Sequence, residues 1–165
     1  MNRALLLGAT VLVSCVCSVA GAQGDSVVGS WKLVSYDTTT PDGVKTFPLG
    51  DDAVGQLIYL ASGRMSVQFM RRDRPKFKSG DAWRGTLEEE RAAFEGFFSY
   101  AGRYTIDAAR GTVTHHIEIS AAPNYVGTDV VRNFTMQGNH IILKTPQRAL
   151  AGQTSSSTLI WERID

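Results

Sequence analysis

Apolar and polar residues alternate in short runs along most of this chain. Runs of about four to eight residues with this alternation, rich in Val, Ile, Thr and aromatic residues and bounded by Gly, Pro, Asn, Asp or Ser, are typical of half-buried strands. Segments with this pattern cover residues 29–36, 54–60, 64–70, 100–107, 112–120, 128–136, 140–145 and 158–164. The sequence therefore predicts eight short strands, most of them joined by hairpin turns.

One segment has helical spacing instead. Thr86 and Glu89 have the spacing of a capping box, in which the hydroxyl and the carboxylate each accept a hydrogen bond from backbone N–H groups at the start of a helix. Leu87, Phe94 and Phe98 then fall on one side of the predicted helix. We predict a helix from Leu87 to about Phe98, inserted between the third and fourth strands, as a lid or plug over one end of the sheet.

The order of these elements restricts the fold class. No helices alternate with the strands, so a parallel α/β sheet is excluded. Closing an antiparallel sheet into a barrel removes its exposed edges, and a barrel of about eight strands is just wide enough to hold one small ligand. We predict an all-β protein: an eight-stranded antiparallel up-and-down barrel with one inserted helix at about 87–98.

The hairpin over residues 112–134 carries two ionisable residues on otherwise apolar strand faces. His115 shares its face with valine and isoleucine side chains, and Arg132 shares its face with valine, phenylalanine and methionine. An ionisable side chain that points inward needs a partner or a ligand to offset its desolvation. Strand parity and hairpin order predict that both lie on one interior wall, provided that no bulge intervenes.

The start of the chain has the pattern of an export signal. Arg3 precedes an apolar stretch over residues 4–19, and Ala20-Gly21-Ala22 then supplies small residues where a signal peptidase cleaves. Glycine and hydroxyl residues interrupt the stretch, which makes it a poor membrane span. We predict a signal peptide over residues 1–22, a single domain over residues 23–165, and a periplasmic or secreted location.

A second processing route stays open. Leu12-Val13-Ser14-Cys15 resembles the lipobox of bacterial lipoproteins, in which the cysteine becomes the lipidated first residue, and it would give a membrane-anchored lipoprotein. Cys15 and Cys17 are the only cysteines of the chain. Cleavage after Ala22 would leave no disulfide, so the hydrophobic core would have to stabilise the exported domain.

Charge and residue spacing argue against two classes of partner. The chain has 17 Lys and Arg and 16 Asp and Glu, and loss of Arg3 with the presequence makes these numbers equal. A nucleic-acid binder would have a strong basic excess. His115 and His116 are adjacent in a strand and point to opposite faces, so they cannot chelate one metal together. We expect no metal and no cofactor.

Several motifs together resemble a known family. Gly29-Ser30-Trp31 matches the Gly-x-Trp signature of lipocalins, and Arg163 ends the last strand, where that fold places an arginine over the tryptophan. Further matching motifs follow in order at residues 55–59, 62–68, 100–104, 113–118, 130–132 and 159–163. From Val28 onwards the chain resembles the lipocalin-like domain family of bacterial and fungal proteins. The resemblance implies a calycin-type barrel that binds a small molecule, with Trp31 and Arg163 closing one end.

Two features depart from typical lipocalins. The chain ends two residues after Arg163, without the C-terminal helix, and it carries the predicted internal helix over residues 87–98. The family resemblance brings little chemistry with it, because the biochemical role of the family is mostly unassigned.

The candidate ligand site is the interior of the barrel. His115 and Arg132 are its polar centre. The other predicted ligand-binding residues are the hydroxyl-bearing Tyr100 and Tyr104 and the apolar Met65, Phe69, Ile117 and Phe134. Two alternatives stay open: His115 is a core histidine bonded to the backbone or to a tyrosine, and Arg132 forms a structural ion pair with Asp129, Glu118 or another carboxylate.

Three functions are compatible with these residues. We expect a non-enzymatic exported barrel that binds a small hydrophobic or amphipathic molecule. The first alternative is a cofactor-free isomerase, cyclase or dehydratase, with His115 as acid or base and Arg132 stabilising negative charge. The second is an envelope structural or interaction module with a filled barrel. No nucleophile elbow, phosphate loop or dinucleotide fingerprint is present in the sequence.

Overall fold

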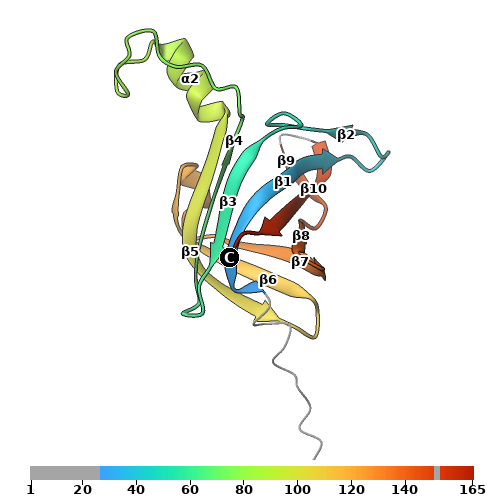
Figure 1. Cartoon of the computed structure of the whole chain (residues 1–165). Coiled ribbons are helices and arrows are strands. Elements are labelled where there is room, and N and C mark those ends of the chain that lie inside the picture. Colours follow the sequence, from blue (N-terminus) through green and yellow to red (C-terminus); the bar gives the residue numbers. More distant parts are fainter. Residues whose placement is uncertain (1–26, 151–152) are drawn as a thin grey trace, which may run out of the picture.

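A computed structural model describes residues 27–150 and 153–165 of the chain, and Figure 1 shows long strands wound into a barrel with one helix beyond its end. The predicted signal peptide over residues 1–22, with Cys15, lies outside the described residues. Within the described ranges, no helix combines the length and apolar character needed to cross a membrane.

Eight strands form the barrel, and each pairs antiparallel with the next. They are β1 (Gly29–Thr39), β3 (Val54–Tyr59), β4 (Arg64–Met70), β5 (Phe97–Asp107), β6 (Thr112–Ser120), β7 (Asp129–Gln137), β8 (His140–Lys144) and β10 (Gln153–Arg163). Pairing of β10 with β1, from Trp31↔Arg163 to Thr39↔Ser156, closes the barrel. The predicted eight-stranded up-and-down barrel is confirmed.

Three short elements decorate this barrel. The two-residue strand β2 (Lys45–Thr46) pairs with the end of β1, and β9 (Arg148–Leu150) pairs with the start of β10. A single 3₁₀ turn, η1 (Pro123–Tyr125), lies in the loop between β6 and β7. The sequence prediction began the last strand at Thr158, but β10 begins at Gln153. Its first residues, Gln153 to Ser155, pair with β9, and Ser156 and Ser157 pair with the end of β1, so strand pairing extends β10 through a polar segment.

The helix α2 (Leu87–Glu95) begins where the capping box predicts. Thr86 Oγ1 accepts a hydrogen bond from Glu89 N (3.3 Å), and Glu89 Oε2 accepts one from Thr86 N (2.8 Å). The helix ends at Glu95, so the predicted end near Phe98 is wrong. Phe97 and Phe98 instead open β5, where they pair with Met70 and Phe69 of β4. Strand pairing overrides the helical spacing of these aromatic residues.

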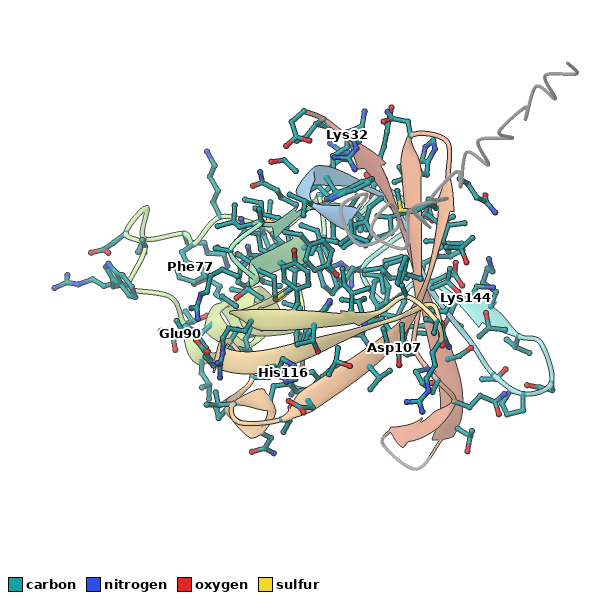
Figure 2. All side chains as sticks on the ribbon, turned by 90° about the horizontal axis from the view of Figure 1, so that it is seen from below. Lys32, Phe77, Glu90, Asp107, His116 and Lys144 are labelled. Carbon is teal, nitrogen blue, oxygen red and sulfur yellow. The ribbon has the colours of Figure 1, made fainter. Side chains whose placement is uncertain are left out.

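The helix does not plug the barrel. None of its residues is buried, and Leu87 and Phe94 are 85% and 57% exposed. The segment that carries Phe77 and Glu90 projects beyond the barrel end (Figure 1, Figure 2). Only the last turn of α2 comes close to the barrel, because the chain passes from there directly into β5.

One end of the barrel is closed by Trp31 and Arg163. Trp31 is fully buried, and its indole N–H donates to the carbonyl of Val27 (3.0 Å). The Arg163 guanidinium carbon lies 4.2 Å from the centre of the Trp31 ring, and Arg163 Nη1 donates to the carbonyl of Val28 (2.8 Å). A cation stacked on an indole is attracted by the electron-rich face of the ring, so this pair stabilises the closed end.

A register shift in β5 makes Gly102 sensitive to substitution. The pairing of β5 with β6 shifts between Ala101 and Gly102. A Cβ atom at Gly102 would collide with the backbone carbonyl oxygen of His116, which cannot rotate away. Gly102→Ala is therefore expected to lower the free energy of unfolding by about 1–3 kcal/mol in urea titrations. Ala101→Ser, on the neighbouring outward-facing residue, should change it by less than about 0.5 kcal/mol; equal effects would contradict the clash.

Candidate functional site

A cavity of about 530 Å³ lies at the end of the barrel opposite Trp31 and Arg163. Its walls come from the ends of β1, β4 and β8, the starts of β5, β7 and β10, the end of α2 and the loops between them. The lining residues are Tyr36, Thr38, Pro48, Leu49, Phe69, Phe94, Glu95, Phe97, Phe98, Ala121, Ala122, Tyr125, Arg132, Thr145, Ser155, Ser157 and Leu159. Most of this surface is apolar, which suits a small hydrophobic ligand.

Arg132 is the buried cation of this cavity. Inward and outward residues alternate along β7, and this alternation turns Arg132 inward, where it is only 7% exposed. Its Nη1 atom is buried and has no hydrogen-bond partner in the described part of the chain. An unpaired buried donor on a charged group costs free energy. A ligand that pairs with Arg132 would therefore be stabilised by this interaction.

The carboxylates predicted as structural partners of Arg132 have other partners. Asp129 lies 2.7 Å from Nδ1 of His116, on the outer side of the β6–β7 pair. Glu118 accepts hydrogen bonds from Arg64 (2.8 Å) and Arg103 (3.0 Å). Among the described residues, neither carboxylate forms an ion pair with Arg132, which lines the cavity.

His115 is bonded on both ring nitrogens. It is 1% exposed; its Nε2 lies 2.6 Å from the hydroxyl of Tyr59 and its Nδ1 lies 2.8 Å from the hydroxyl of Tyr100. A neutral imidazole has one donor and one acceptor, so one tyrosine donates to the ring and the other accepts from it. Of the two interpretations left open by the sequence, this geometry matches the core histidine bonded to tyrosine.

The electrostatic environment keeps His115 and Tyr59 neutral. Burial lowers the pKa of His115 to about 3, with further lowering by the positive charges of Arg132 and His116. Burial and the neighbouring Tyr100 raise the pKa of Tyr59 well above its usual value. At neutral pH, Arg132 therefore lies near a neutral imidazole and the protonated hydroxyl of Tyr59.

The family can now be assigned. The sequence profile of the lipocalin-like domain matches residues 28–164. The chain belongs to the lipocalin-like domain family. A 4'-hydroxy-3'-methoxypropiophenone carrier protein from Aspergillus oryzae is 30% identical over 107 residues, which span 61% of this chain and 96% of that protein. A lipocalin-like protein from Bacteroides uniformis has a solved structure that covers 83% of this chain and 97% of its own, with a TM-score of 0.41 and 12% identity.

The lipocalin-like barrel separates the predicted site residues into two groups. Arg132 and Phe69 line the cavity. The others are buried in the core beside it and are not part of its wall: His115, Tyr100, Tyr104, Met65, Ile117 and Phe134. Strand parity identifies which residues point inward, but it does not say how far along the barrel axis the interior is filled.

His115 and Arg132 nevertheless lie close together. Arg132 pairs with Val113 and His115 pairs with Val130, so the two side chains are diagonal neighbours on the inner face of β6 and β7. The register shift in this region lies between β5 and β6, at Ala101 and Gly102, and leaves the β6–β7 register regular. The influence of Arg132 on the pKa of His115 reflects this closeness.

Sequence reasoning missed most of the cavity wall of the lipocalin-like domain. The missed residues lie where strands end and loops begin, for example Leu49, Ala121 and Tyr125, and there the alternating pattern gives no inward or outward direction. Thr145 and Ser157 form a hydroxyl-bearing part of the wall, where Thr145 Oγ1 accepts a hydrogen bond from Ser157 N (2.6 Å). Tyr59 could have been identified from the sequence, because it lies two residues after Leu57 on β3 and therefore shares its inward face.

No described part of the lipocalin-like domain gathers three His, Cys, Asp or Glu side chains in a metal-binding arrangement. The chemistry of the cavity is instead that of one cation, several hydroxyls and an aromatic wall. Such a set can orient and retain a small amphipathic molecule.

Proposed function

We propose that this protein is an exported carrier that binds a small hydrophobic or amphipathic molecule in the cavity at the open end of its barrel. The observation that carries the proposal is the cavity of about 530 Å³. Ligand pockets for small molecules have volumes of roughly 300–1,000 Å³ and mostly apolar walls with a few polar groups. The name of the Aspergillus oryzae relative, a carrier of 4'-hydroxy-3'-methoxypropiophenone, supports the same kind of function.

The contacts of His115 argue for binding rather than catalysis. A general acid or base must reach the substrate with a free nitrogen and must change protonation state near working pH. Both nitrogens of His115 are engaged by Tyr59 and Tyr100, and its pKa is lowered to about 3 by burial. The residue also lies outside the cavity wall, so no observation favours the isomerase or dehydratase alternative.

The export part of the proposal depends on the N-terminal sequence. The apolar stretch over residues 4–19 and the Ala20-Gly21-Ala22 site support cleavage after Ala22 and a periplasmic or secreted protein. Intact-mass analysis of the protein made in its own host should give a chain that begins at Gln23. A chain that begins with a lipid-bearing Cys15 would overturn this cleavage and indicate a membrane-anchored lipoprotein.

Blocking the cavity tests the carrier proposal. Ala121 lines the cavity from the loop after β6 and is only partly buried, so a tryptophan there would fill the mouth without displacing core side chains. We expect Ala121→Trp to weaken binding of the fluorescent probe N-phenyl-1-naphthylamine by about tenfold or more, which corresponds to 1.4 kcal/mol or more. Fluorescence titration measures this change.

The matched control places the same side chain at the other barrel end. Ala109 is exposed in the turn between β5 and β6. Ala109→Trp should leave probe affinity unchanged, and both variants should keep the thermal midpoint of the wild type within a few degrees. If Ala121→Trp binds the probe as tightly as wild type, the cavity is not the binding site.

A further inference from the structure

We propose that the ligand of this cavity is an aromatic monoanion whose carboxylate, sulfonate or phenolate oxygen pairs with the guanidinium of Arg132. This inference rests on the proposed function, because it assigns a chemical class to the molecule carried in the same cavity. It depends on three observations: a buried cation with an unpartnered donor, the absence of a counter-charge among the described groups around it, and a wall of aromatic rings.

The first observation is the state of Arg132. A guanidinium has five N–H donors in a planar fork that matches two oxygens of an anion. At 7% exposure, Arg132 has lost most of its hydration, yet its buried Nη1 has no partner among the described residues. A buried charge is stabilised by a paired opposite charge, and a ligand anion in the cavity that Arg132 lines could supply that charge.

The second observation is that the carboxylates around the cavity already have partners. Glu95, which lines the rim, is bonded to Arg91 on its own helix (2.8 Å). The buried Asp37 of β1 is bonded to Lys45 (3.2 Å). Asp129 faces outward to His116, and Glu118 faces outward to Arg64 and Arg103, as described above. In the described parts of the chain, Arg132 is thus left without a carboxylate partner.

The polar core beneath the cavity cannot supply the counter-charge either. The raised pKa of Tyr59 keeps its hydroxyl protonated, and the lowered pKa of His115 keeps the imidazole neutral. Neither Tyr59 nor His115 therefore has a negative charge to offer Arg132. A second positive charge on His115 is also avoided, so among the described lining residues Arg132 is the one cation presented to a ligand.

The third observation is the shape of the apolar wall. Four lining rings form a continuous series of contacts, with centroids 5.2 Å apart for Tyr36 and Phe69, 5.5 Å for Phe69 and Phe98, and 5.2 Å for Phe98 and Tyr125. Their planes are tilted or edge-on to each other. Such arrangements accept a further flat ring by stacking or edge-to-face contact, which favours an aromatic ligand body.

Together these features predict selectivity by charge. A neutral aromatic molecule would bury Arg132 more deeply and leave its donors unpaired, whereas an anion of the same shape would satisfy them with charge-assisted hydrogen bonds. Two fluorescent probes separate these effects, because 1-anilinonaphthalene-8-sulfonate has the ring system of N-phenyl-1-naphthylamine with one added sulfonate. We expect wild-type protein to bind the sulfonate at least about tenfold more tightly than the neutral probe.

Substitution of Arg132 tests whether this residue causes the preference for the sulfonate probe. Arg132→Met removes the charge at similar length and should weaken sulfonate binding by about tenfold or more while leaving neutral-probe affinity within about threefold. Arg132→Lys should retain part of the preference, because it keeps the charge but not the planar fork. Arg110→Met removes an exposed arginine from the turn at the opposite barrel end, and it should change neither affinity.

Each outcome decides a different point. Equal affinity of wild type for the two probes, or an equal loss of both in Arg132→Met, would overturn the anion proposal and leave the carrier proposal intact. Failure of both probes to bind wild type would overturn the carrier proposal as well. The wild-type comparison needs no variant, so the test stands even if Arg132→Met does not fold.

Discussion

Lowering the pH from 6.5 towards 3 is expected to raise the unfolding equilibrium constant by up to about tenfold per pH unit through His115 alone. The ordinary pKa of 6.5 applies to the unfolded chain, and burial lowers the pKa to about 3 in the fold. Between these values the unfolded state binds a proton that the folded state excludes. Stability therefore falls as the pH falls, and this contribution is fully present above pH 6.5.

The structure explains why the folded protein excludes this proton. A protonated imidazole has two N–H donors, so the tyrosine that donates to His115 would have to reverse its hydrogen bond. The new charge would also lie buried beside the positive charge of Arg132. Both effects favour the neutral ring bonded to Tyr59 and Tyr100.

Urea titrations of wild type and His115→Gln at pH 7 and pH 4 measure this effect. At pH 7 the variant should be less stable by about 1–3 kcal/mol, because glutamine cannot satisfy both tyrosine hydroxyls. Between pH 7 and pH 4 the wild type should lose more stability than the variant, since only the wild type has this histidine to titrate. Parallel loss in both proteins, or an NMR signal of His115 that titrates near pH 6.5, would contradict the prediction.

Trp31→Ala is expected to lower the free energy of unfolding by about 3–5 kcal/mol. The substitution empties a fully buried indole site at the closed end of the barrel and removes the hydrogen bond to Val27. It also leaves the guanidinium of Arg163 without the ring beneath it. The barrel end can collapse only partly, because the Trp31↔Arg163 pairing of β1 with β10 closes the sheet at this point.

Urea unfolding followed by far-ultraviolet circular dichroism measures this loss. Trp83→Ala is the matched control: Trp83 is 91% exposed, so its removal should change stability by less than about 0.5 kcal/mol. Arg163→Met should have an intermediate cost of about 1–2 kcal/mol, from the lost cation–π contact and the lost hydrogen bond to Val28. If Trp31→Ala costs no more than Trp83→Ala, the closed end does not stabilise the barrel.

The strands were predictable from sequence where one side of the strand faces a core. Alternation along residues 112–120 and 128–136 placed His115 and Arg132 on inner faces, where the structure has them. Alternation disappears where a strand is paired but has little apolar burial. The start of β10 at Gln153 and the end of β1 at Thr39 were missed for this reason, since Ser and Thr residues dominate both segments.

The two ends of helix α2 differ in the same way: its start was predictable from local sequence, and its end was not. A local signal, the capping box of Thr86 and Glu89, identified its start. Its end depends on pairing with a strand that is distant in the chain, because β5 begins at Phe97 to pair with Met70. The helical spacing of aromatic residues gives no information on whether strand pairing or the helix is more stable at these positions.

The sequence by itself determined the class of the barrel, the inward direction of Arg132 and a net charge close to zero, because these follow from periodicity and composition, which are properties of the chain alone. Only the tertiary structure decided the depth at which the interior stays open. Closure brings strand ends and loops together around Arg132, engages Asp129 and Glu118 elsewhere, and fills the region around His115 with Tyr59 and Tyr100. Whether a buried polar group has a partner depends on neighbours that are distant in sequence. For this reason the sequence alone could not predict that His115 is fully hydrogen-bonded while Arg132 lines the cavity.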